Sequence, residues 1–137
     1  MFNYLARKKR GRFKRCLLHI GTEKTGTSTI QRFLAANRQA LAAEGVLYPT
    51  CGGGENGGSQ WGFAASAARQ AWKLDLGMFL NIHCAQDQAR YRSALIDDLS
   101  REFEALTGRD ALIISSEHFQ SRLRHMDEIV ALKEFLG

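Results

Sequence analysis

The chain has 137 residues, of which 45% are hydrophobic and 24% charged, with a formal net charge of +5. This length and composition fit one globular domain and exclude collagen, mucin and a wholly disordered chain. No apolar run approaches the roughly 20 residues that a membrane helix needs, and no apolar segment follows the basic N-terminus. We therefore expect a cytoplasmic protein without a membrane span or a secretory signal.

Cysteine and histidine do not form the patterns of a disulfide framework or a zinc site. The three cysteines are odd in number and lack a CxxC pair, so we expect free thiols. The four histidines show neither an i, i+4 pair nor an HExxH motif. The sequence therefore predicts no metal.

A basic leader is predicted at residues 1–15, which hold seven Lys or Arg residues and no acid. Residues 16–137 hold 12 basic and 14 acidic residues, a net charge of −2. Such a leader could attract nucleic-acid phosphates or an anionic membrane, but the remaining domain has no basic excess to extend that surface. We expect a solvated leader and no nucleic-acid partner.

The sequence of the first half of the chain predicts a strand, a helix and a second strand, in that order. Residues 15–21 form an apolar run that ends in glycine, which is typical of a buried, central strand. Apolar residues then recur at helical spacing up to residue 44, with Thr27 or Ser28 available as a cap and an interruption near Asn37. Residues 46–48, before Pro49, predict a short second strand. The expected inward residues of the helix are Ile30, Phe33, Leu34 and Leu41.

A glycine-rich segment divides this half from a helical region. Residues 50–58 hold five glycines, which suits a lid or binding loop as well as a plain connection. Residues 61–80 predict one or two short helices broken at Gly77. Residues 87–106 predict an amphipathic helix whose inward residues fall four apart. They are Tyr91, Leu95, Leu99 and Phe103.

The C-terminal part predicts a buried strand at 111–115 and a last helix at 127–136. Ile129, Val130, Leu132 and Phe135 are its expected inward residues. Strands separated by helical crossovers indicate an open α/β sheet with helices on both faces, and such sheets bind ligands beyond the carboxyl ends of their strands. The polar segments 22–29 and 115–118 both follow such ends, so one ligand could touch both.

The segment 21–29 predicts an anion site. It lies between a strand and a helix start, where free amides and the helix dipole converge, and Gly26 allows close backbone approach. A nucleotide-kinase loop would place lysine directly after the second glycine, followed by a hydroxyl for magnesium. Here Lys24 stands two residues before Gly26, which argues against ATP with magnesium.

The order Ile20-Gly21-x-x-Lys24-Thr25-Gly26-Thr27-Ser28 resembles the phosphosulfate-binding loop of the sulfotransferase family. Residues 45–49 and 114–119 look like segments of its bacterial and Golgi-type branches, so the resemblance covers about residues 16–137. Thr29 stands where cytosolic members carry tryptophan. The resemblance implies a P-loop-NTPase-like parallel sheet with helices on both faces and transfer of a sulfuryl group from 3′-phosphoadenosine 5′-phosphosulfate to an acceptor hydroxyl or amine, without a metal.

The resemblance also implies roles for individual residues. Lys24 would neutralise charge on the bridging oxygen, and the neighbouring residues would hold the 5′-phosphate. Glu117 or His118 would be the base that takes the acceptor proton; a dianionic donor nearby would raise the pKa of Glu117. The structural alternative is that Glu117 caps the following turn and His118 only packs. The implied donor-binding residues are Lys24, Thr25, Gly26, Thr27, Ser28 and Thr29.

The family's contacts to the 3′-phosphate, an arginine and a serine, would follow the helix that ends at Leu136. The sequence is therefore expected to be the N-terminal part of a sulfotransferase, with donor affinity reduced by about 2–5 kcal/mol and an uncovered sheet edge that favours self-association. The acceptor is left open among glycan, lipid, small alcohol and protein.

Two other functions are consistent with the residues. One is a phosphotransferase that uses ATP or GTP through an altered loop, with Glu117 near magnesium. The other is a non-catalytic fragment that binds anions or nucleic acid through the basic leader.

Overall fold

The computed structural model describes residues 13–22, 24–53, 58–108 and 110–137. Residues 1–12 of the predicted basic leader, and residues 54–57 of the glycine-rich segment, lie outside these residues. The α-helices, strands and 3-10 helices (η) in chain order are β1 (Arg15–His19), α1 (Thr27–Ala36), α2 (Arg38–Ala43), β2 (Val46–Leu47), η1 (Cys51–Gly53), α3 (Trp61–Ala67), η2 (Ala71–Lys73), α4 (Asp75–Phe79), α5 (Ala85–Glu104), β3 (Ala111–Ser115), α6 (His118–Arg122) and α7 (Met126–Leu136).

The sheet is parallel and has the strand order β1-β3-β2, which confirms the α/β class. The prediction that the first strand is central and buried is wrong for the described chain. β3 is the central strand, with Leu112 and Ile114 buried in the core, whereas β1 pairs with β3 alone. Leu17 on β1 is 53% exposed, because β1 has no second neighbour among the described residues.

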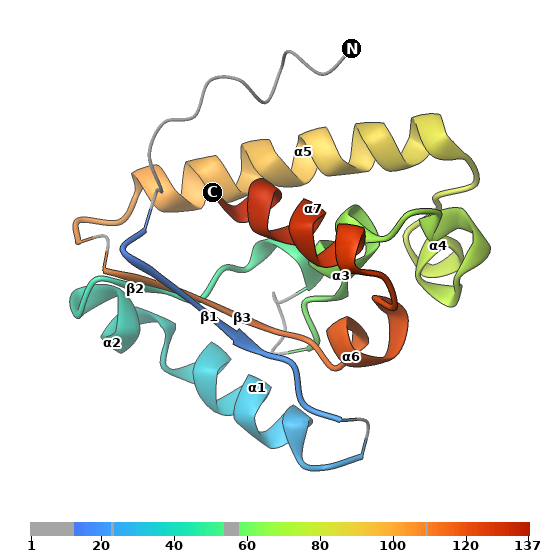
Figure 1. Ribbon diagram of the computed structural model, residues 1–137. Helices are drawn as coiled ribbons and strands as arrows, with labels where there is room; N and C mark the ends of the chain where they lie inside the picture. The colour runs from blue at the N-terminus through green and yellow to red at the C-terminus, as the bar shows by residue number, and fades with distance from the viewer. Residues whose placement is uncertain (1–12, 23, 54–57, 109) are drawn as a thin grey trace.

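Helices cover the sheet from both sides, as predicted. The crossover from β1 to β2 passes β3, and the chain then returns from β2 to β3, so right-handed connections place their helices on opposite faces. Figure 1 shows α1 and α2 on one side of the strands and α3, α5 and α7 on the other. None of the described helices is long and apolar enough to cross a membrane.

The helix after β1 is interrupted at Asn37, as predicted, but its inward face is different. Ile30 is 45% exposed and Phe33 is 64% exposed, whereas Thr27 and Gln31 are buried. The prediction of an apolar inward face is wrong because the buried Gln31 faces a polar partner, Glu117, beneath α1. The N-cap is Gly26, with no side-chain cap, so the expected cap at Thr27 or Ser28 is also wrong.

The region 61–80 is helical, but its helices are not separated at Gly77. Gly77 lies inside α4, and the interruption falls after α3 instead. A side chain at Gly77 would press on the backbone of Trp72 and Ile82, which shows that this glycine serves close packing rather than helix termination.

The long amphipathic helix is confirmed as α5, with Leu95 and Leu99 buried in the core. Burial raises the pKa of Tyr91, on the same face, to about 12. The last helix, α7, buries Leu132 and Leu136, whereas Ile129 and Val130 are about half exposed and were wrongly expected to face inward. The short helix α6 was not predicted.

Candidate functional site

The two polar segments expected to share a ligand begin side by side. His19 and Ser115 are paired in the register of β1 and β3, and the Ser116 amide donates to the His19 carbonyl at 3.0 Å. The loop after β1 and the segment after β3 therefore leave the same edge of the sheet.

The loop between β1 and α1 turns through left-handed backbone. Lys24 has φ +63° and Gly26 has φ +85°. A left-handed conformation is uncommon for a residue with a side chain, and at Lys24 it is held within a tight turn. The Thr25 hydroxyl donates to the Thr22 carbonyl at 2.6 Å and so closes this turn. Lys24 is exposed and forms no ion pair with any described residue.

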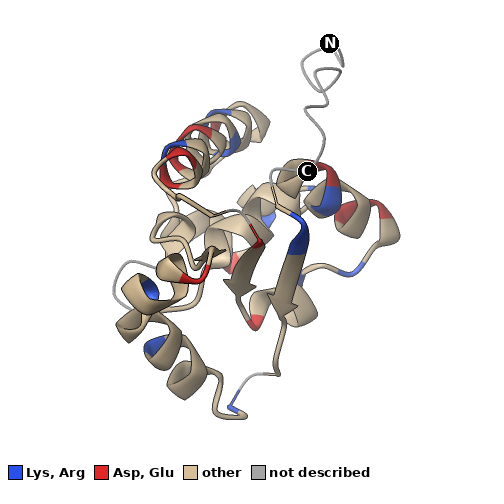
Figure 2. Ribbon diagram, turned by 90° about the vertical axis from the view of Figure 1, so that its left-hand side faces the viewer, with Lys and Arg blue, Asp and Glu red and all other residues tan. Residues whose placement is uncertain are grey.

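The start of α1 offers donors to an anion. Its N-cap carries no side-chain hydrogen bond, and the amides of Thr27 and Ser28 have no acceptor among the described residues. These amides lie at the positive end of a 10-residue helix. In Figure 2, α1 and α2 show basic but no acidic residues.

The residues predicted to bind the sulfuryl donor differ in whether their hydroxyl groups are free to contact it. Thr27 is buried, with its side chain against Gly21. Ser28 and Thr29 are exposed and keep their hydroxyls available, whereas the Thr25 hydroxyl is already engaged in the turn.

Glu117 and His118 lie beyond β3 and are both about one-fifth exposed. Glu117 Oε2 accepts a hydrogen bond from Gln31 Nε2 at 3.1 Å, so it contacts α1. Glu117 occupies the N-cap position of α6 without a side-chain cap bond, which removes the alternative that its side chain caps this turn. The Nε2 of His118 lies 4.0 Å from Glu117 Oε1, and its Nδ1 is buried without a partner.

The pKa of Glu117 in the free protein is lowered, not raised. Burial alone would raise it, but hydrogen bonds from its own amide, Gln31 and Ser59, together with nearby His118, outweigh burial. The expectation of a raised pKa assumed a bound dianionic donor and does not hold for the free protein. Glu117 is therefore ionised at neutral pH and able to accept a proton.

Sequence reasoning missed the residues that support this site. Gln60 is fully buried, and its amide oxygen accepts from the Ser115 amide at 2.8 Å. The hydroxyls of Ser59 and Ser116 are 2.7 Å apart, and His19 Nδ1 lies 2.7 Å from Ser115 Oγ. His19 could have been found from its place at a predicted strand end, whereas Ser59 and Gln60 follow a glycine-rich segment that gives no positional signal.

The described residues contain no group of three or more His, Cys, Asp or Glu side chains placed to hold a metal. Comparisons with known protein families, with curated proteins and with solved structures found no match to this chain.

Proposed function

We propose that the loop between β1 and α1 binds the phosphosulfate end of 3′-phosphoadenosine 5′-phosphosulfate, and that the protein transfers its sulfuryl group to an acceptor hydroxyl or amine. The proposal extends to a P-loop-like fold for the sheet. It rests above all on Lys24, which stands in a left-handed turn two residues before the glycine that begins α1. The unoccupied amides of α1 support it, because they suit a phosphate.

In the proposed reaction the acceptor oxygen or nitrogen attacks sulfur as the bond from sulfur to the 5′-phosphate oxygen breaks. Adenosine 3′,5′-bisphosphate leaves, and Lys24 neutralises the charge that develops on the bridging oxygen. The acceptor proton passes to Glu117 or His118. Glu117 has the stronger support, because its carboxylate contacts Gln31 on α1, the helix whose amides would hold the phosphate.

Calorimetric titration distinguishes this proposal from a phosphotransferase. We expect adenosine 3′,5′-bisphosphate to bind without added metal and more tightly than Mg-ATP, because the lysine does not follow the glycine as a kinase-type loop requires. Tighter binding of Mg-ATP would favour the phosphotransferase. Binding of nucleic acid, with neither nucleotide bound, would favour the non-catalytic alternative.

The substitution Lys24→Ala should abolish sulfuryl transfer while leaving the fold intact, because Lys24 is exposed and unpaired in the described chain. Loss of such a positioned cation costs on the order of 10²–10³ in kcat. Transfer from radiolabelled donor to a panel of acceptors measures the effect, and Lys73→Ala, at another exposed lysine, is the control. Equal transfer by the Lys24 variant and the wild type would contradict the proposed mechanism.

A further inference from the structure

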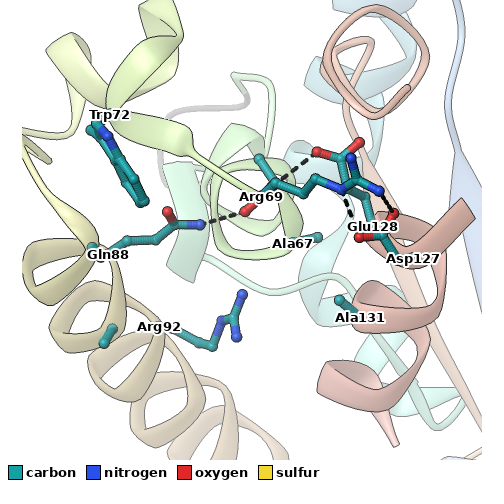
Figure 3. A pocket seen from close by; sticks show the side chains of 11 residues that line it. Ala67, Arg69, Trp72, Gln88, Arg92, Asp127, Glu128 and Ala131 are labelled. Atoms are coloured by element: carbon teal, nitrogen blue, oxygen red, sulfur yellow. Dashed lines mark hydrogen bonds and ion pairs between the residues drawn. The ribbon is translucent and has the colours of Figure 1, made fainter. Parts of the chain in front are cut away.

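A pocket lies between the end of α3, the first half of α5 and the start of α7 (Figure 3). Its volume is about 300 Å³, at the lower end of the range for small-molecule sites. None of its lining residues belongs to the loop after β1 or to the segment after β3. It is therefore separate from the candidate site above.

One cation in this pocket lacks a counter-ion. Arg92 projects from α5 into the pocket, and one of its terminal nitrogens, Nη2, donates to the Ser66 carbonyl. Its Nε is buried without a partner, and Nη1 has no partner among the described residues. No carboxylate in the described chain forms an ion pair with Arg92, so a partly buried positive charge is left uncompensated.

The two carboxylates that line the pocket are already committed. Asp127 accepts two hydrogen bonds from Arg69, at 2.7 and 2.8 Å. Glu128 accepts from the amides of Arg69, Arg124 and His125 at 2.8–3.0 Å. Neither carboxylate is available to Arg92, and together they disfavour a ligand that carries more than one negative charge.

The remaining wall is apolar and held in place. The half-buried ring of Trp72 lines one side, and alanines from three helices leave the space open. Gln88 donates to the carbonyls of Ala65 and Ala68 and accepts from the amide of Ala71, which fixes the floor beside Trp72.

We propose that this pocket binds a small aromatic carboxylate. The carboxylate of the ligand contacts Arg92, whose Nε has no partner in the protein, and its ring lies against Trp72 and the alanines. Arginine favours planar carboxylates because its guanidinium presents several donors in one plane.

Titration of the full chain with benzoate, followed by NMR of the amide signals, tests this proposal. We expect saturable shifts at the amides of Ala67, Ala89 and Ala131, with a dissociation constant of about 1 mM or tighter. Benzamide, which has the ring without the charge, should bind at least about tenfold more weakly. Equal binding of benzamide, or no saturable shift up to about 20 mM benzoate, would overturn the proposal.

The substitution Arg92→Gln should weaken benzoate binding by at least about tenfold. Arg90→Gln is the matched control, because Arg90 lies on the same helix, is exposed and pairs with Asp87. Unchanged affinity in the Arg92 variant would overturn the proposal. If that variant does not fold, Arg92→Lys retains the charge but not the planar donors, and it should still bind more weakly than wild type.

The proposal can fail independently of the sulfuryl-transfer function. Lys24→Ala should leave benzoate affinity unchanged, and adenosine 3′,5′-bisphosphate should not displace benzoate, because the two sites share no residue. Displacement by the bisphosphate would show that benzoate occupies the loop site and would overturn the assignment to this pocket.

Discussion

At the scale of single residues, the contact between Gln31 and Glu117 joins the two parts of the candidate site. Gln31 is a polar residue with only 2% of its surface exposed, and its amide donates to the Glu117 carboxylate. This bond ties α1, whose first amides are proposed to bind the phosphate, to the residue proposed as the base. The inward face of α1 is polar for this reason.

The substitution Gln31→Leu should raise the pKa of Glu117, because it removes one of the donors that stabilise the carboxylate. The carboxyl carbon signal of Glu117, followed by NMR against pH, measures the change. Gln39→Leu, at an exposed position on α2, is the control. An unchanged Glu117 titration would contradict the role given to Gln31.

The same bond makes a pH-dependent contribution to stability. Because the folded-state pKa of Glu117 is below its ordinary value, the ionised carboxylate stabilises the fold at neutral pH, and this stabilisation is lost as the pH falls through the folded-state pKa. The difference in unfolding free energy between wild type and Gln31→Leu should therefore shrink on acidification, which urea titrations at neutral and acid pH would measure. A difference that grows on acidification would contradict this sign.

At the scale of elements, α5 holds the segment that follows β2. Glu102 accepts hydrogen bonds from the amides of Thr50 and Cys51 and from the Thr50 hydroxyl, at 2.7–3.1 Å. Burial, followed by the nearby Glu102 carboxylate, raises the pKa of the Cys51 thiol, so this cysteine is a poor nucleophile. Glu102 therefore anchors the first residues of the glycine-rich segment to α5.

The substitution Glu102→Ala should destabilise the fold by about 1–3 kcal/mol, because two amides and a hydroxyl lose their acceptor. Urea unfolding measures this loss, and hydrogen exchange at Thr50 and Cys51 should accelerate. Glu104→Ala, two residues further along the same helix and exposed, is the control. Similar effects of both substitutions would show that Glu102 does not anchor this segment.

At the scale of the whole molecule, one side of the sheet is left open along β1. Leu17, Leu18 and Ile20 are 41–53% exposed, and β1 pairs only with β3 in the described chain. Exposed strand edges with apolar side chains favour association between chains.

We expect the protein to self-associate with increasing concentration and Leu17→Lys to reduce this association, because a charge on an edge strand opposes pairing. Sedimentation velocity over a concentration series measures the effect. Met126→Lys is the control, because Met126 is 77% exposed but lies on α7. A wild-type chain that stays monomeric, or equal association by both variants, would contradict a role for β1.

The sequence predicted those elements whose hydrophobic pattern is compatible with only one type of secondary structure. The run of residues 111–115 is apolar throughout and forms the central strand with the predicted limits, and the four-residue spacing in 87–106 identified α5. Helix orientation was less predictable. Ile30 and Phe33 have helical spacing, but the sheet-facing side of α1 was determined by Gln31 and its distant partner Glu117, which sequence spacing does not reveal.

The candidate site was predictable where its residues follow strands. Lys24, Gly26 and Glu117 stood at predicted carboxyl ends, and parallel pairing brought these ends together. Gln60 was not predictable, because its buried contact with Ser115 spans 55 positions of the chain and depends on the path of the intervening loop. Arg92 was not predictable as a binding residue, because its lack of a counter-ion depends on the packing of three helices at once.

The in-register pairing of His19 with Ser115 limits how the two segments that leave this edge of the sheet can move relative to each other. Parallel strands change register only by whole residues, and a shift of one residue would turn every side chain of β1 to the opposite face. The sheet therefore fixes where the loop after β1 begins relative to the segment after β3. Under the proposed function, acceptors of different size would be accommodated by the side chains of these two segments and not by a change of register.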